Sequence, residues 1–237
     1  MPLSNWLHLP IVMHYVIRLR PQRLLDVGVG FGAYGVLTRQ YLDAGYGRYA
    51  KPDWALTVDG VEVHAPYRNP VWDYAYNQVR LGDVAAVLPE LSGYDLILCL
   101  DVIEHFELAG VRRLSERLLE VADIVVYTTP AENSPQGACF GNPAEMHRSH
   151  VQGRDLAGVV ACHAAGATRV YVCALKPAAV ARVLTAARTA PVVMDPARCR
   201  SLRAWRWLVR IGRGLDRRVR ALLHRRPALP PPAGSGG

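Results

Sequence analysis

The sequence predicts an α/β fold in which helices flank a doubly wound, mostly parallel sheet. Three observations predict this fold class. Apolar runs of strand length alternate along the chain with helix-compatible segments, as they do in consecutive βαβ units. A glycine-rich turn follows the first apolar run, residues 23–29. Carboxylates end several of the runs, and polar groups at the carboxyl ends of parallel strands face the ligand crevice of such sheets.

The expected elements follow the chain in order. A helix over residues 5–19 has apolar residues at helical spacing and stops before Pro21. Residues 94–101 form a continuous apolar run, as expected of a strand buried on both faces. The other expected strands cover residues 54–63, 76–81, 123–129 and 168–176, and the other expected helices cover residues 33–44, 109–121, 154–166 and 178–187.

The glycine-rich turn has the spacing Asp-x-Gly-x-Gly-x-Gly, formed by Asp26, Gly28, Gly30 and Gly32. Glycine lets the backbone approach a ligand without a Cβ in the way, and the free N–H groups at the start of the next helix suit polar or anionic ligand atoms. Together with Ala33, the first two glycines also satisfy the looser dinucleotide pattern G-x-G-x-x-A. By itself the turn fits a nucleoside cofactor, a dinucleotide or no ligand at all.

A carboxylate also stands at the end of the second expected strand. Glu62 can accept two hydrogen bonds at once, which suits the two hydroxyls of a ribose. It lies 34 residues after Gly28, and the glycine- and proline-marked loop 45–52 accounts for this long separation. The alternative is that Glu62 only ends the strand.

The motifs occur in the chain order DVGVGFG, VDGVEV, GDV, YDLILCLDVIEHF, TTP and GN-x-x-E-x-H-R-S. Over residues 15–177 this series resembles the class I S-adenosylmethionine-dependent methyltransferases, in particular bacterial branches that act on small molecules. The resemblance implies a Rossmann-like sheet. It also implies S-adenosylmethionine as cofactor, held by Asp26, Gly28, Gly30, Gly32, Glu62, Asp83, Val84 and Asp101.

Three of these residues receive individual roles from the resemblance. Asp83 is expected to face the adenine amino group, and the backbone N–H of Val84 to meet a ring nitrogen. Asp101 is expected to contact the methionyl amine. The alternatives are that Asp83 is an acid of a β-turn and that Asp101 simply finishes its strand.

Residues 130–150 form the longest stretch without periodicity, and loops of this length inside a domain are usually functional or disordered. Methyl transfer to a hydroxyl benefits from a base, and histidine has a suitable pKa. The expected base is His147, with Glu145 or Glu104 as its orienting carboxylate, and His105 is the second candidate. A metal site formed by Asp101, His105, His147 and His150 is the rival interpretation, although no closed ligand set is visible.

The predicted function is therefore S-adenosylmethionine-dependent methyl transfer to an oxygen or nitrogen atom of a small molecule. One alternative is a non-catalytic cofactor-binding or scaffold protein that docks through a basic tail. An NAD-dependent oxidoreductase is disfavoured because no Tyr-x-x-x-Lys pair is present.

The net charge of +8 belongs to the C-terminal segment. Residues 198–226 contain 11 arginines and one acid, Asp216, and the 197 residues before them are slightly acidic. We expect a methyltransferase domain over residues 1–190, a basic amphipathic helix over 198–226 and a disordered tail over 227–237. Within the helix, residues 201–224 would contact an anionic membrane or an acidic partner, and nucleic acid ranks lower because no base-stacking module accompanies the charge.

Bulk features set the remaining expectations. No apolar run reaches the ~18 residues that a spanning helix needs, and the N-terminus lacks a secretory pattern. The five cysteines show no C-x-x-C spacing and fit reduced thiols. We therefore expect a cytoplasmic protein, with membrane association only through the basic helix.

Overall fold

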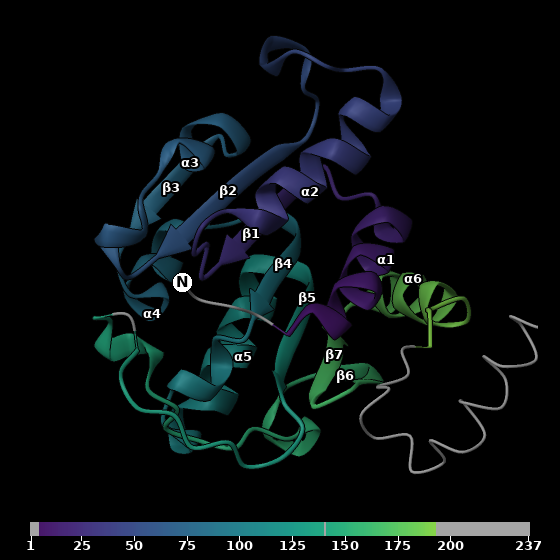
Figure 1. Cartoon of the computed structure of the whole chain (residues 1–237). Coiled ribbons are helices and arrows are strands. Elements are labelled where there is room, and N and C mark those ends of the chain that lie inside the picture. Colours follow the sequence, from purple (N-terminus) through teal and green to yellow (C-terminus); the bar gives the residue numbers. More distant parts are fainter. Residues whose placement is uncertain (1–4, 140, 193–237) are drawn as a thin grey trace, which may run out of the picture. The chain divides into compact units, whose positions relative to one another are not determined.

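A seven-stranded sheet organises the computed structural model, which describes residues 5–139 and 141–192 (Figure 1). The strand order is β3-β2-β1-β4-β5-β7-β6. The strands are β1 (Arg23–Val27), β2 (Thr57–Glu62), β3 (Gln78–Leu81), β4 (Tyr94–Leu100), β5 (Ala122–Pro130), β6 (Val159–Ala165) and β7 (Thr168–Ala174). The first five strands pair in parallel, and β7 pairs antiparallel with both β5 and β6, so the prediction of a mostly parallel sheet is confirmed.

Helices cover both faces of the sheet because alternate residues of each strand point to opposite sides. Leu24 packs with one core cluster and Leu25 with the other. The first cluster includes residues of α1 (Leu9–Leu19), α2 (Ala33–Leu42), α3 (Pro70–Ala75) and α6 (Pro177–Ala187). The second includes residues of α4 (Val84–Val87) and α5 (Leu108–Val121). This three-layer arrangement is the predicted doubly wound fold.

Two strands end where the backbone turns left-handed. β1 stops at Val27, two residues before the expected end, because Gly28 takes φ +80°. β4 stops at Leu100 because Asp101 takes φ +53°, which is rare for a residue with a side chain. Both breaks occur at carboxyl ends of central strands, so they place the following residues at the edge where ligands bind in such sheets.

The helix expected over residues 154–166 is wrong. This region contains strand β6, which forms a hairpin with β7. Gly158 and Gly166 flank the strand and adopt φ +63° and +60°, which a helix cannot accommodate. The alanines of the segment favour a helix locally, but pairing at the sheet edge overrides that propensity.

All described residues belong to one unit, Met1–Asp195. The predicted basic helix, residues 198–226, and the predicted tail, residues 227–237, lie outside the described residues. The domain boundary at residue 190 stays a prediction. Each helix within the described ranges is too short or too polar to cross a bilayer.

Replacing Gly35 with alanine should destabilise the fold, because a Cβ there would lie 2.4 Å from two ring atoms of Tyr76. Tyr76 is fully buried and cannot move aside. We expect the free energy of unfolding, measured with urea, to fall by about 1–3 kcal/mol. Gly110→Ala is the matched control: it also lies in a helix, nothing lies within 4 Å of its added Cβ, and it should not lose stability. Equal stabilities for the two variants would contradict this packing.

Candidate active site

The glycine turn leaves β1 and enters α2 through three left-handed glycines. Gly28, Gly30 and Gly32 have φ values of +80°, +52° and +87°. A Cβ on Gly28 would lie 2.4 Å from a methyl carbon of Val102, which follows β4. Side chains at these positions would therefore strain the backbone, and at Gly28 they would also collide with the neighbouring strand end.

Glu62, at the end of β2, joins that strand to the glycine turn. Its Oε2 accepts the N–H of Gly30 at 2.8 Å, and its Oε1 accepts the N–H of His64 at 2.8 Å. A carboxylate has about four acceptor positions, so two hydrogen bonds leave capacity for hydroxyl groups. The structure thus brings the predicted ribose-binding acid into direct contact with the predicted cofactor turn.

Asp26 lies behind the turn and is only 3% exposed. Its Oδ2 accepts the hydroxyl of Tyr76 at 2.5 Å, and the same hydroxyl accepts the N–H of Gly35 at 3.1 Å. Burial raises the pKa of Asp26 to about 7; the hydrogen bond from Tyr76 opposes this shift and the charge of Glu62 adds to it. Through Tyr76, the carboxyl of Asp26 is therefore connected to α2 on the far side of the glycine turn.

Asp83 caps α4, where its Oδ1 accepts the N–H of Ala85 at 2.7 Å. Its side chain is exposed at the end of β3, and Val84 beside it is buried. The end of β3 is next to the end of β2 in the sheet. Glu62 is opposite Leu81 in that pairing, so Asp83 lies two residues beyond the last strand pair and performs the capping role of a turn acid.

Asp101 follows β4 and is oriented by Thr128 on β5. Its N–H donates to the carbonyl and the hydroxyl oxygen of Thr128, and its Oδ1 accepts the Thr128 hydroxyl at 2.7 Å. The other oxygen, Oδ2, lies 4.0 Å from Nδ1 of His8. Two strands thus hold Asp101 in its left-handed conformation, with one carboxylate oxygen directed toward the N-terminal segment.

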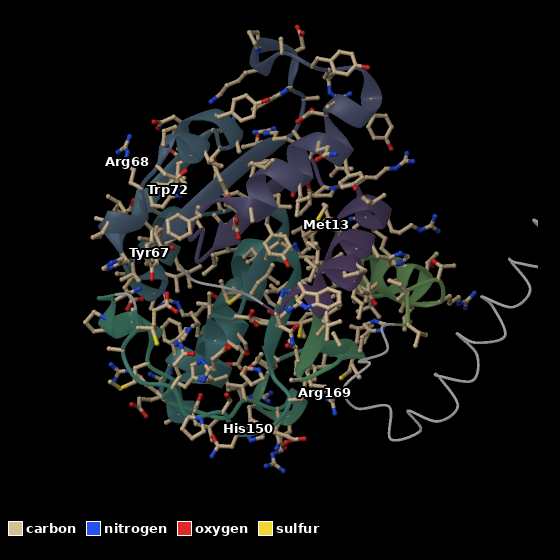
Figure 2. All side chains as sticks on the ribbon, in the orientation of Figure 1. Met13, Tyr67, Arg68, Trp72, His150 and Arg169 are labelled. Carbon is tan, nitrogen blue, oxygen red and sulfur yellow. The ribbon has the colours of Figure 1, made fainter. Side chains whose placement is uncertain are left out.

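The loop after β5 crosses the same edge of the sheet. Glu145 lies in a short 3₁₀ turn, Pro143–Glu145, and its Oε1 accepts the hydroxyl of Tyr67 at 2.9 Å. Tyr67 follows β2 and lies on the same side of the molecule as Trp72 (Figure 2). The indole N–H of Trp72 donates to the carbonyl of Gly30 at 2.9 Å. Residues after β2 therefore connect the loop to the glycine turn.

The two candidate bases lie together but differ in what their nitrogens contact. The rings of His105 and His147 are 5.1 Å apart. Both nitrogens of His105 face backbone carbonyls, those of Met146 and Asp101. Burial lowers the pKa of His105. His147 places Nδ1 2.5 Å from the carbonyl of Ser134, so a proton on Nδ1 leaves the Nε2 lone pair free.

The carboxylates expected to orient His147 make other contacts. Glu145 is engaged by Tyr67, so the orienting partner of His147 is the Ser134 carbonyl. Glu104 is 1% exposed, and its Oε2 has no hydrogen-bond partner. Burial, with the nearby charge of Asp101, raises the pKa of Glu104 well above its usual value. Its backbone carbonyl accepts two N–H groups of the loop, from Arg148 and Ser149.

Sequence reasoning did not single out His8, Tyr67 or Tyr76. The two tyrosines stood in or beside expected elements, but nothing in the pattern showed that their hydroxyls meet Glu145 and Asp26. His8 stood in the predicted N-terminal helix as one of two polar residues that interrupt an apolar stretch. Only the tertiary arrangement shows that its ring is fully buried beside Asp101.

Two further features concern ligand binding. Among residues 5–139 and 141–192, no three His, Cys, Asp or Glu side chains are grouped so that they could hold a metal ion.

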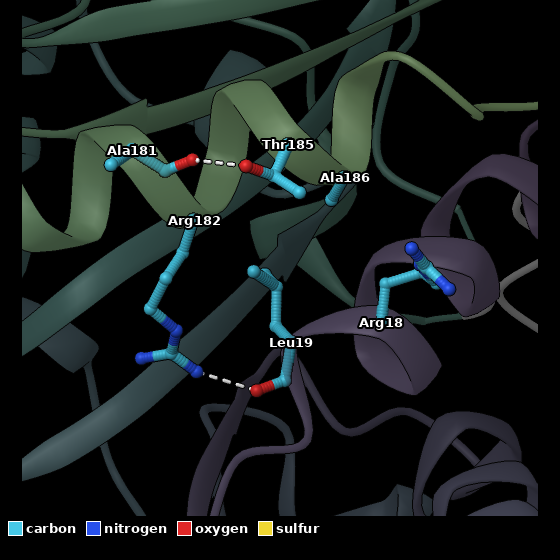
Figure 3. A pocket seen from close by; sticks show the side chains of 6 residues that line it. All are labelled: Arg18, Leu19, Ala181, Arg182, Thr185 and Ala186. Atoms are coloured by element: carbon cyan, nitrogen blue, oxygen red, sulfur yellow. Dashed lines mark hydrogen bonds between the residues drawn. The ribbon is translucent and has the colours of Figure 1, made fainter.

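A surface cavity of about 280 Å³ lies between the end of α1 and α6, lined by Arg18, Leu19, Ala181, Arg182, Thr185 and Ala186 (Figure 3). This cavity contains none of the candidate site residues.

Comparison with solved structures identifies the fold. Neither protein-family models nor curated protein sequences match the chain. The structure of a candidate O-methyltransferase from Nostoc punctiforme aligns with a TM-score of 0.50 and 14% identity, covering 72% of this chain and 56% of that one. The chain has the class I methyltransferase fold.

Two other solved structures align at slightly lower scores. The N-terminal domain of EvdMO1, solved with S-adenosylhomocysteine bound, has a TM-score of 0.49 and 15% identity, covering 70% of this chain and 81% of that one. The methyltransferase domain of bacterial CtHen1 has a TM-score of 0.47 and 17% identity, covering 72% of this chain and 99% of that one.

Asp26→Asn should change how stability depends on pH. The pKa of Asp26 is about 7 in the folded protein and near 3.8 when unfolded, so between these values only the folded chain keeps the proton. The free energy of unfolding of the wild type therefore falls as pH rises through this window. Asparagine does not ionise and keeps an acceptor for Tyr76. The free energy of unfolding of the variant, relative to that of the wild type, should therefore rise by up to roughly 3 kcal/mol from pH 5 to pH 8.

Urea denaturation at both pH values measures this difference. Asp53→Asn, at an exposed aspartate, is the control and should follow the wild type at both pH values. Parallel pH profiles for wild type and Asp26→Asn would show that the folded protein does not hold the proton on Asp26.

Proposed function

We propose that this chain is an S-adenosylmethionine-dependent methyltransferase that transfers a methyl group to an oxygen or nitrogen atom of a small molecule. One observation carries the proposal. The predicted cofactor acids stand at the carboxyl ends of four adjacent strands, β3, β2, β1 and β4, and Glu62 binds the glycine turn between them. The class I fold agrees with this assignment.

The residues present fit this cofactor. The left-handed glycines leave the turn without side chains that would block a ligand. Glu62 accepts two hydrogen bonds and has further acceptor positions for ribose hydroxyls. Asp83 and the N–H of Val84 would hold the adenine, and Asp101 the methionyl amine. The cofactor would supply a methyl group on a sulfonium, from which a neutral thioether departs as a good leaving group. The protein therefore chiefly aligns the acceptor and excludes water.

The loop after β5 would complete the acceptor side of the site. A hydroxyl acceptor would give its proton to Nε2 of His147, whose tautomer the Ser134 carbonyl fixes. His105 has both nitrogens on carbonyl groups and would serve as a packing partner of that imidazole. Glu145, bound to Tyr67, would position the loop.

Calorimetric titration tests the cofactor directly. We expect micromolar binding of S-adenosylhomocysteine and no binding of NAD, because the acids at the strand ends suit hydroxyls and amines rather than a pyrophosphate. Binding of NAD alone would favour an oxidoreductase. Binding of neither ligand would contradict the proposal and favour a scaffold role.

Gly30→Val should abolish binding of S-adenosylhomocysteine, because its side chain would stand where the backbone approaches the ligand. Gly30 has φ +52°, so valine also strains the backbone by ~1–2 kcal/mol. Gly47→Val carries similar strain at φ +81°, in a loop with nothing within 4 Å of the added Cβ, and should bind normally. Circular dichroism checks that both variants fold. Normal binding by a folded Gly30→Val protein would remove the site from this turn.

His147→Ala should retain S-adenosylhomocysteine affinity and lose turnover by ~10²–10⁴-fold on a hydroxyl acceptor identified by screening small alcohols, phenols and sugars. The loss reflects a missing proton acceptor rather than a missing cofactor contact. Calorimetry and radiolabelled methyl transfer measure the two properties separately. Unchanged turnover would exclude His147 as the base.

A further inference from the structure

The charges of the domain are divided between two parts of the sequence. Residues 1–25 and 156–194 together contain seven arginines and lysines and no Asp or Glu, a net charge of +7. Residues 26–155 contain 10 basic and 18 acidic residues, a net charge of −8. A folded domain usually intersperses both signs over its surface, and a large field of one sign attracts a partner of the other.

The two acid-free stretches meet where α1 packs against α6. Nε2 of His14 contacts the carbonyl of Ala186, and Arg182 reaches from α6 to the carbonyl of Leu19 at the end of α1 (Figure 3). Four exposed arginines lie on these two helices or directly after them. We call this surface the basic face: Arg18, Arg20, Arg182 and Arg188.

The basic face is not neutralised by carboxylates in the described part of the chain. The arginines and lysines that form ion pairs there are other residues. Arg20 instead lies 5.6 Å from the ring centroid of Tyr46, and Arg182 donates to a backbone carbonyl. The four guanidinium groups therefore keep their full positive charge at the surface.

The surface cavity between α1 and α6 lies within the basic face. Arg18 and Arg182 both line it, and two guanidinium groups beside a hollow suit the oxygens of a phosphate. Carbonyls at the ends of the two helices would repel an anion, but those of Leu19 and Ala186 are occupied by Arg182 and His14. The cavity is thus open to an anionic group.

An apolar side chain beside the arginines favours a lipid surface over a nucleic acid. Leu184 on α6, two residues after Arg182, is 49% exposed. A bilayer interface buries such a side chain while it attracts the neighbouring cations. A single-stranded nucleic acid would need free aromatic rings for stacking, and the ring of Tyr46 already carries the guanidinium groups of Arg20 and Arg48.

We propose that the basic face binds the anionic surface of a lipid bilayer. The arginines supply the electrostatic attraction, Leu184 enters the interface, and a lipid phosphate approaches the cavity between Arg18 and Arg182. The arginine-rich segment 198–226 begins ten residues after Arg188, so both cationic regions of the chain suit one and the same surface.

A bilayer bound at the basic face leaves the candidate active site open. α1 follows His8, which lies beside Asp101 at the carboxyl end of β4, and it ends at Leu19, four residues before β1 begins. The basic face therefore lies toward the amino ends of the strands, and the predicted cofactor acids stand at the carboxyl ends. The inference is independent of the proposed function.

Co-sedimentation of the full chain with lipid vesicles tests the inference. The wild type should bind vesicles of phosphatidylcholine that contain about one third phosphatidylglycerol, and should not bind vesicles of phosphatidylcholine alone. Lipid is titrated at the salt concentration at which about half of the wild type is bound, because salt weakens electrostatic binding and brings it into the measurable range.

The triple variant Arg18→Gln, Arg182→Gln, Arg188→Gln should bind the anionic vesicles about 100-fold more weakly, since each arginine near such a surface contributes about fivefold. Glutamine keeps a side-chain donor for the carbonyl of Leu19. Thermal unfolding checks that the variant is folded.

The matched control removes the same charge elsewhere. Arg112→Gln, Arg113→Gln, Arg154→Gln changes exposed arginines on and near α5, which covers the other face of the sheet, and should bind like the wild type. Leu184→Gln should weaken vesicle binding about threefold to tenfold, and Leu108→Gln, at a 47% exposed position of α5, should not weaken it.

Each remaining outcome overturns the inference. If the wild type does not bind anionic vesicles, or binds neutral vesicles equally well, the basic face is not a site for anionic lipid. If both triple variants weaken binding equally, net charge alone is responsible, and if neither does, the binding comes from another part of the chain. A single-stranded RNA oligonucleotide is titrated in parallel. If the basic-face variant loses affinity for RNA and keeps it for vesicles, the partner is a nucleic acid.

Discussion

The hydroxyl of Tyr76 connects the three elements from which the candidate site is built. It donates to Asp26 at the end of β1 and accepts from Gly35 in α2, while the residue itself precedes β3. Its ring fills the space that a side chain at position 35 would need. The hydroxyl therefore ties the end of β1 to α2 across the glycine turn. The carboxylate of Glu62 accepts the N–H of Gly30 within that turn.

The acids of the site differ in what surrounds them, and this difference separates their roles. Asp26 is closed off beneath the turn, where its pKa is raised by burial. Both oxygens of Glu62 accept backbone N–H groups, whereas Asp101 has one oxygen bound to Thr128 and the other directed toward His8. Glu104 is also buried, and its backbone carbonyl binds the loop after β5.

Much of this arrangement could be predicted from the sequence because parallel strands buried on both faces leave continuous apolar runs. The glycine turn, Glu62 and Asp101 came from the same logic, since residues after such runs meet at one edge of the sheet. The edge strand β6 could not be predicted in this way, because its alanines favour a helix and only pairing with β7 decides otherwise. Contacts between distant side chains, such as Tyr76 with Asp26 and His8 with Asp101, leave no local signal. The orienting role of the Ser134 carbonyl on His147 was equally inaccessible, since it depends on how an irregular loop folds.

The packing of α1 against α6 has a consequence for how the chain acquires this site during synthesis. Nε2 of His14 contacts the carbonyl of Ala186, and Arg182 donates to the carbonyl of Leu19. Some partners of the helix that follows His8 therefore become available only when residues near position 187 have left the ribosome. The glycine turn and its neighbouring strands can pair before that point. The N-terminal edge of the site, although translated first, is completed last.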